Sequence, residues 1–309
     1  MRNKTNYSKK RPKKKSPYPT KRSLGTWIYL CILFAALVFA GYSVYRWVRI
    51  QTTHVPDKKV SADRVVTGRL KTKGMQSERA DDRGITTGTE NRMAIVIDDM
   101  GRDPLILDEI LEIDAPITVS VLPHLSHSLL VAEKANAAGR EVILHLPMEP
   151  HEYPEKRPGS GALFVHMNRG EIIEQVKGDI MNVPYISGVN NHMGSKFMED
   201  EQKVEIVLDQ LKKRDLFFLD SLTSKNSKGI RIAKKIGLRH VARDIFLDND
   251  CDFEETLDIL HRIAEKRNSW KTLVIIGHPH ESTIQALKHA LPMFHDRKIR
   301  IVPLSDLVR

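Results

Sequence analysis

Cysteine is scarce in this chain of 309 residues, which contains only two. Cys31 lies in an apolar segment near the amino terminus and Cys251 in the polar remainder, so an internal disulfide framework is excluded. Zinc sites made of two or four cysteines are excluded by the same count. A Walker A motif is absent, and no G-x-G-x-x-G follows the first strand-like run, which argues against P-loop and dinucleotide-binding folds.

Acidic residues are absent from residues 1–22, which hold ten Lys and Arg. The whole chain has 49 basic and 39 acidic residues, so the remainder is formally neutral and the excess positive charge belongs to this head. A nucleic-acid-binding domain would carry its basic residues on the fold itself. Nucleic acid is therefore not an expected partner.

A long uncharged run follows the basic head and predicts a transmembrane anchor over residues 24–48. A segment of roughly 20 apolar residues is long enough to cross a bilayer as a helix. The positive-inside rule keeps the head, residues 1–23, in the cytoplasm, so we expect a single-pass protein of the inner (cytoplasmic) membrane. Its carboxyl-terminal part is then periplasmic or extracellular. The alternative is a cleaved signal peptide, whose apolar region is usually shorter, at about 7–15 residues.

Residues 49–91 are polar and lack apolar periodicity, as is typical of a flexible linker. From residue 92 to residue 309, strand-like apolar runs alternate with amphipathic helical patterns. This alternation predicts an α/β fold, a distorted parallel (β/α) barrel, with a doubly wound open sheet as the structural alternative. The predicted strands are 94–97, 117–122, 141–145, 186–189, 216–219, 240–246, 273–276 and 299–304. The predicted helices are 105–111, 128–138, 171–181, 200–214, 226–236, 253–266 and 283–294, with Asp200 and Ser282 as the expected N-caps of the fourth and the last.

Carboxylates and imidazoles follow four of these strands, and the carboxyl ends of parallel strands gather functional groups. Asp98 and Asp99 end the first strand, where a divalent cation relieves the repulsion between adjacent carboxylates. One aspartate is expected to bind metal while the other acts as a base. The alternative is that one of them caps the following helix. The pattern as a whole predicts a metal-centred hydrolase site.

Three histidine-bearing segments supply the remaining candidates. In HLPMEP, His145 is a candidate metal ligand and Glu149 a weaker one, and the prolines predict a constrained turn after His145. In NNHMGS, His192 is a candidate ligand, and Asn190, Asn191 and Ser195 are candidate hydrogen-bonding partners for substrate or for the ligands, although an ordinary turn would have the same composition. In IGHPH, His278 and His280 are candidate ligands or general acids.

Further polar residues end two other strands and have two interpretations. Asp220 ends one of them, and Arg243 and Asp244 interrupt the other. They either orient catalytic histidines or form structural salt bridges.

The motifs IVIDDMG, HLPMEP, GVNNHMGSKF, FFLDS and IGHPH, in that order, resemble those of the divergent polysaccharide deacetylases. These are YibQ-type relatives of the NodB-homology carbohydrate esterases, and the resemblance spans residues 92–309. It implies a distorted barrel and a divalent metal, usually zinc, although Asp and His ligands accept several ions.

The resemblance also implies roles for particular residues. The earlier aspartate of the first motif acts as the base, which maps onto Asp98, and the later one is a ligand, which maps onto Asp99. His145 is retained, and His192 supplies the imidazole missing from the second motif. His278 matches the closing acid.

The expected activity is N- or O-deacetylation of an envelope polysaccharide by a membrane-tethered hydrolase. The alternative is a non-catalytic envelope protein that binds glycan or protein on the same barrel. Aromatic residues form only 6% of the chain, so an extended sugar-stacking surface is not evident. Tyr153 and Phe164, in the loop after the third strand, either line a groove or, for Phe164, pack in the core.

Overall fold

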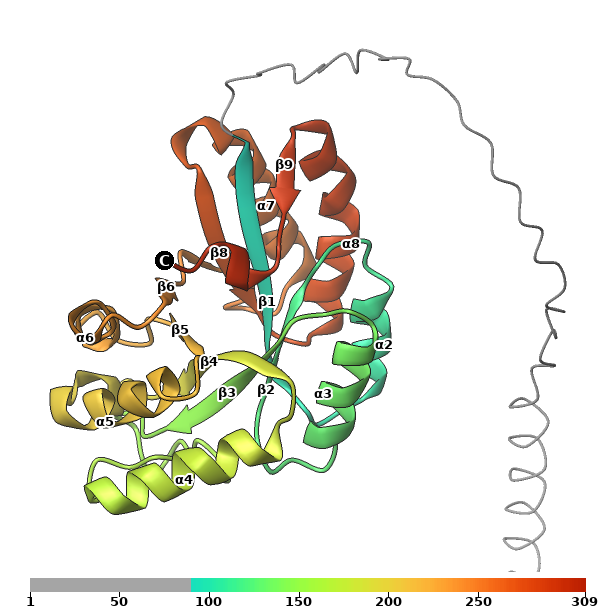
Figure 1. The fold of residues 1–309 in the computed structure, drawn as a ribbon. Coiled ribbons are helices and arrows are strands. Elements are labelled where there is room, and N and C mark those ends of the chain that lie inside the picture. Colours follow the sequence, from blue (N-terminus) through green and yellow to red (C-terminus); the bar gives the residue numbers. More distant parts are fainter. Residues whose placement is uncertain (1–89) are drawn as a thin grey trace, which may run out of the picture. The chain divides into compact units, whose positions relative to one another are not determined.

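The computed structural model describes residues 90–309, in which all paired strands run parallel in one curled sheet (Figure 1). The sheet order is β6-β5-β4-β3-β2-β1-β8-β7, and β9 pairs with the start of β1. The strands are β1 (Asn91–Met100), β2 (Thr118–Val121), β3 (Val142–Met148), β4 (Ile186–Met193), β5 (Phe217–Asp220), β6 (His240–Ala242), β7 (Ile245–Phe246), β8 (Thr272–Gly277) and β9 (Ile299–Ile301).

Helices connect all successive strands except β6 and β7, as parallel pairing requires. They are α2 (Leu105–Leu111), α3 (Ser128–Ala137), α4 (Arg169–Asn182), α5 (Glu201–Lys212), α6 (Gly229–Ile236), α7 (Phe253–Glu265) and α8 (Glu281–Asp296). Local sequence explains several boundaries. Asp200 caps α5 by accepting a hydrogen bond from the backbone of Lys203, as predicted, and Asn168 with Glu171 forms a capping box on α4.

The two faces of the sheet carry separate apolar clusters. Ile95 and Ile97 pack against the helices, whereas Ala94 and Val96 face the inside of the curl. The inner cluster also contains Val302, Leu304 and Leu307 of the carboxyl-terminal segment. Burying each of these aliphatic side chains contributes about 1.5–3 kcal/mol. The inside of the curl is therefore packed at one end, and polar side chains occupy the other.

The predicted strand 240–246 is two strands at opposite edges of the sheet. The backbone nitrogen of Arg243 donates to Asp220 on one edge, and that of Asp244 donates to Val274 on the other, at 3.0 and 2.8 Å. Residues 243–244 thus cross the gap between the edges, and the half-barrel has no β6–β7 pairing. The apolar residues on either side of Arg243 and Asp244 do not reveal this change of partner.

The turn predicted after His145 is also wrong, because β3 continues to Met148. Pro147, which has no N–H to donate, lies beyond Leu144, the last residue of β3 that pairs with β2, and its carbonyl accepts a hydrogen bond from Leu163 at 2.9 Å. Within residues 90–309, no helix is both long and apolar enough to span a bilayer. The predicted head, anchor and nearly all of the linker lie outside these residues and remain predictions.

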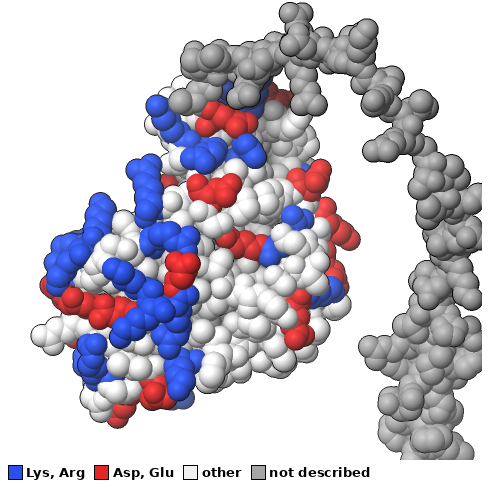
Figure 2. Space-filling view, viewed as in Figure 1, with Lys and Arg blue, Asp and Glu red and all other residues white. Residues whose placement is uncertain are grey.

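The charges of the described residues are unevenly spread. Residues 90–309 contain 29 Lys and Arg and 34 Asp and Glu. Figure 2 shows basic side chains gathered over the part of the surface formed by α5 and α6. Some of them are paired, since Lys235 of α6 lies 3.0 Å from Glu205 of α5. Exposed pairs of this kind contribute little to stability.

Candidate active site

Four side chains from β1, β3 and β4 meet at the carboxyl ends of these strands. Asp98 and Asp99 come from β1, His145 from β3 and His192 from β4. His145 Nε2 lies 3.1 Å from Asp99 Oδ1 and 3.6 Å from Asp98 Oδ2. His192 Nδ1 lies 2.9 Å from Asp99 Oδ1 and 3.1 Å from His145 Nε2. These four residues are called the acid–imidazole cluster below.

A bulge in β1 brings both aspartates to the same side. Ala94 and Val96 alternate onto the inner face, so Asp98 continues that face. The register with β2 then shifts between Ile97 and Met100, and Asp99 has a left-handed φ of 55°. Such a backbone is costly for a non-glycine residue and is found at functional sites, where it redirects a side chain.

Asn190 of β4 determines which nitrogen of His145 faces the cluster. The Asn190 amide donates to Asp98 Oδ1 at 2.9 Å, since two oxygens cannot share a hydrogen bond without a proton. Its oxygen therefore faces His145 Nδ1, which donates to it at 2.9 Å, and also accepts from Ser120 Oγ at 2.8 Å. In the neutral imidazole, the lone pair is then on Nε2 and points toward Asp99.

Charge in the cluster is not balanced by the side chains alone. Asp99 Oδ1 is buried yet accepts no hydrogen bond with proper geometry. Burial by itself would raise the pKa of Asp99, but the imidazoles of His145 and His192 outweigh it and hold that pKa well below its usual range. Burial also disfavours protonation of His145, and the carboxylates of Asp98 and Asp99 raise its pKa nonetheless. The cluster attracts positive charge, which a proton or a cation supplies.

The donor set fits a divalent cation. One carboxylate oxygen and two imidazole nitrogens, from Asp99, His145 and His192, all lie within 4.8 Å of one another. Zinc accepts carboxylate oxygen and imidazole nitrogen at about 2.0–2.2 Å, and catalytic zinc sites use three protein ligands. Histidines that bind a metal through one ring nitrogen usually donate a hydrogen bond from the other, as His145 Nδ1 does to Asn190. These three residues are the ones in the described domain that would hold the ion.

His278, after β8, is paired with a carboxylate that the sequence reasoning did not single out. Its Nδ1 lies 2.9 Å from Asp248 Oδ1, and its backbone nitrogen donates to Asp248 Oδ2 at 2.6 Å. Thr283 also donates to Asp248, at 2.7 Å. Burial lowers the pKa of His278, but the hydrogen bond and charge of Asp248 outweigh it and raise that pKa to about 9. His278 is therefore protonated at neutral pH.

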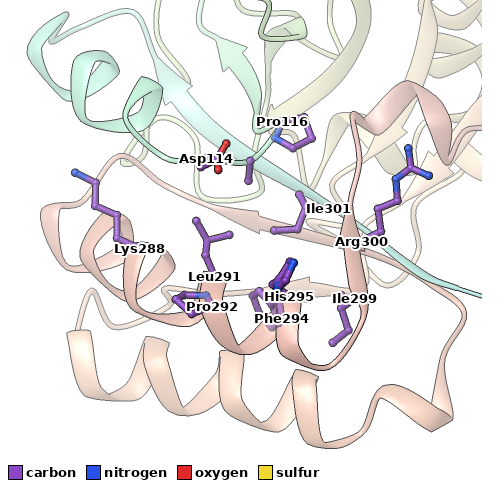
Figure 3. Close-up of a pocket in the computed structure, with 11 residues that line it drawn as sticks. Asp114, Pro116, Lys288, Leu291, Pro292, Phe294, His295, Ile299, Arg300 and Ile301 are labelled. Carbon is purple, nitrogen blue, oxygen red and sulfur yellow. The ribbon is translucent and has the colours of Figure 1, made fainter.

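A cleft joins the two groups. Asp99, His278 and His280 line a cavity of about 550 Å³ between the loops that follow β1 and β8. A second cavity, of about 540 Å³, lies between α8 and β9 at the opposite end of the strands (Figure 3). It is lined by Lys288, His295 and Arg300 among others, and it contains none of the predicted site residues.

Glu149 lies outside the acid–imidazole cluster, contrary to its candidacy as a ligand. Its side chain is buried, and both oxygens are occupied. Oε1 accepts from Lys196 Nζ at 2.7 Å, and Oε2 accepts from the backbone of Val165, also at 2.7 Å. Because β3 continues past His145, Glu149 is carried beyond the cluster and ties two loops together.

Asp220 and Asp244 likewise serve backbone structure. Asp220 faces α6 and accepts from Ser227 Oγ at 2.7 Å, and Asp244 accepts from the backbone of Val274 at 2.7 Å. Neither expected role is observed: among residues 90–309, neither carboxylate forms a salt bridge, and neither hydrogen-bonds to a histidine.

Arg243 and Asn191 hold the loop after β5. Arg243 donates to the carbonyl of Ser221 at 2.8 Å and stacks over Phe246 at 3.7 Å, and Asn191 accepts from the backbone of Ser221 at 2.9 Å. His280 is exposed on the cleft, with its ring centroid 6.0 Å from that of His278. His280, Asp248 and His278 form a second set of residues whose potential metal-ligand atoms lie within 4.8 Å of one another.

Asp248 was not predicted, because the candidates Arg243 and Asp244 were taken from within the predicted strand 240–246. The acidic segment LDND, residues 247–250, begins only after that run, and Asp248 follows β7 by two residues. The same rule of polar residues at strand ends would have found it with the observed strand boundaries.

Comparison with known proteins agrees with these motifs. A family model described as divergent polysaccharide deacetylase matches residues 95–308. The Escherichia coli K12 protein YibQ, described as uncharacterised, is 35% identical over 201 residues, which is 64% of this chain and 61% of YibQ. This chain thus matches about three fifths of the length of that relative.

Two further relatives have no described activity. A Haemophilus influenzae protein is 29% identical over 220 residues, or 71% of this chain and 78% of its own length. The crystal structure of an uncharacterised Agrobacterium tumefaciens C58 protein superimposes with a TM-score of 0.67 at 24% identity, covering 71% of this chain and 89% of that one. That likeness concerns the fold alone. On the match over residues 95–308, the chain belongs to the divergent polysaccharide deacetylase family.

Proposed function

We propose that this protein is a metal-dependent hydrolase that removes acetyl groups from a polysaccharide of the cell envelope. Family membership supports a glycan-related hydrolase. The observation that carries the finer proposal is the convergence of Asp99 Oδ1, His145 Nε2 and His192 Nδ1, with the Asp99 oxygen buried and unpartnered. These three residues would hold a divalent ion, with zinc as the first candidate, which would supply Lewis-acid polarisation of an acyl carbonyl and a lowered pKa of water.

The proposed reaction uses one base and one acid from this chain. Asp98, held by Asn190, takes a proton from a water molecule whose oxygen bonds to the acetyl carbon. The C–N or C–O bond to the sugar then breaks, and protonated His278 gives its Nε2 proton to the departing amine or alkoxide. The products are acetate and a free amino or hydroxyl group on the glycan. Asp248 keeps His278 charged and oriented for this transfer.

We further propose that residues 24–48 anchor the protein in the cytoplasmic membrane with the domain outside the cytoplasm. The uncharged run and the basic head support this arrangement. It would bring the domain to envelope glycans. Digestion of intact and permeabilised spheroplasts tests it, since a domain protected from protease in intact spheroplasts would contradict the proposal.

The test of the activity combines metal analysis with product detection. The purified full chain should contain about one equivalent of divalent metal and release acetate from chitooligosaccharides or peptidoglycan fragments. Asp98→Asn should abolish turnover while metal stays bound, and His192→Ala should lose the metal. Asp114→Asn, in the distant cavity of Figure 3, is a matched control that should keep both.

Two outcomes would contradict the proposal. Full activity of Asp98→Asn would remove Asp98 as the base. Stoichiometric metal without acetate release across a broad glycan panel would favour the alternative, a glycan- or protein-binding protein on the same half-barrel.

A further inference from the structure

Three aromatic rings lie in a row in the loop between β3 and α4. The ring centroids of Tyr153 and Phe164 are 4.9 Å apart with their planes tilted by 59°, and those of Phe164 and His166 are 5.5 Å apart with their planes at 26°. Tyr153 is 42% exposed and His166 is exposed, while Phe164 between them is half-buried. The three residues are called the aromatic row below. Phe164 thus lines a surface and does not belong to the core.

The loop that carries the aromatic row is fastened to the strands that supply the two histidines of the cluster. The buried Glu149 carboxylate accepts from the backbone of Val165, between Phe164 and His166, and Glu149 lies four residues beyond His145. On the other side of the loop, the backbone of His151 donates to Ser195 Oγ at 2.9 Å, three residues beyond His192. The aromatic row is therefore on the rim of the half-barrel where β3 and β4 end.

The chemistry of this rim fits a sugar. A pyranose ring has a face of C–H groups bordered by hydroxyls, and an aromatic face next to polar side chains complements both parts. The loop also carries His151, Glu152 and Lys156, all exposed. Mutual packing holds the rings of the row in place, so little conformational entropy remains to be lost on binding. Exposed aromatic side chains that cluster are a mark of a binding surface.

We propose that Tyr153, Phe164 and His166 form a stacking platform for sugar rings that flank the acetylated sugar of a glycan substrate. The inference rests on the proposed function for the identity of the ligand. It adds that the protein binds sugars of the glycan beyond the acetylated one.

Binding without turnover tests the platform independently of catalysis. The full chain, purified in detergent and stripped of metal with a chelator, is titrated calorimetrically with N-acetylglucosamine and its tetramer. Tyr153→Ala should weaken binding of the tetramer about three- to tenfold, the effect of losing one stacked ring, and should leave binding of the single sugar unchanged. Phe164→Leu keeps the buried volume and should give a similar loss. Tyr185→Ala, an exposed tyrosine between α4 and β4, is the matched control.

Each outcome has a defined meaning. Tetramer binding that is the same in wild type, Tyr153→Ala and Phe164→Leu overturns the platform, as does the absence of any tetramer binding by the wild-type protein. Acetate release assayed in parallel on the metal-loaded protein separates this inference from the proposed function. Ring-dependent binding without acetate release leaves the platform standing and removes the deacetylase. Acetate release that Tyr153→Ala does not change at any oligomer length supports the deacetylase and overturns the platform.

Discussion

Replacing Asp248 with asparagine keeps the size of the side chain and removes the charge that faces His278. In the folded domain, Asp248 is the main reason that the pKa of His278 is raised from 6.5 to about 9. At about 1.36 kcal/mol per pH unit, this difference corresponds to roughly 3 kcal/mol of stabilisation. The value is an upper bound, because the His278 side chain is 28% exposed and water screens part of the interaction.

The sign of the pH dependence follows from the direction of the shift. The folded pKa lies above the unfolded one, so between about pH 6.5 and 9 the folded protein holds a proton that the unfolded chain has released. The stabilisation is complete below 6.5 and is lost as the pH rises through about 9. The Asp248→Asn variant lacks most of this dependence.

Urea unfolding of wild type and Asp248→Asn across this pH range measures the effect. The difference in unfolding free energy should approach about 3 kcal/mol near pH 6 and shrink by about pH 10 to a remainder from altered hydrogen bonds to Thr283 and the His278 backbone. NMR titration of the His278 ring should move from about 9 toward 6.5. A difference that stays constant with pH would refute the reasoning, because the effect would then be packing and not charge.

Three further predictions concern separate parts of the domain. Gly188→Ala should lower the unfolding free energy in urea by about 3 kcal/mol, since the new Cβ would lie 2.3 Å from the ring of Phe217. The control Gly178→Ala, with open space around it in α4, should raise that free energy by about 0.5–1 kcal/mol. Equal effects of the two substitutions would contradict this prediction. Glu149→Gln should lower stability by about 1–3 kcal/mol and leave the metal content unchanged, and loss of metal would restore this residue as a ligand. Asn190→Ala should weaken metal binding about 10–100-fold in chelator competition, while unchanged affinity would show that its contacts do not tune the site.

The parts of the fold that local sequence encodes were predictable from the chain. Near-continuous apolar runs predicted the parallel strands, and Asp200 predicted the start of α5. Ser282 was a wrong choice of cap, because α8 begins at Glu281 and the serine lies inside its first turn, where it bonds to the carbonyl of Cys251. A cap is assigned correctly only if the first residue of the helix is known, and helix propensity alone does not locate that residue to within one position.

The acid–imidazole cluster was partly predictable for a topological reason. Parallel strands present their carboxyl ends at one edge of the sheet, so polar residues that follow such strands are brought together whatever the sequence distance between them. That rule selected Asp98, Asp99, His145, His192 and His278 from sequence order alone. It could not exclude Glu149, since exclusion depended on β3 continuing for three residues past His145.

By itself, the sequence determined the alternation of strands and helices, the family of the domain and most residues of its candidate site. These depend on local periodicity and on short motifs, which the chain carries without reference to distant partners. Only the tertiary structure decided that Asn190 sets the tautomer of His145, that Asp248 charges His278, and that Tyr153, Phe164 and His166 share a rim. Each of these depends on where side chains from different elements point, which is settled by packing across the sheet.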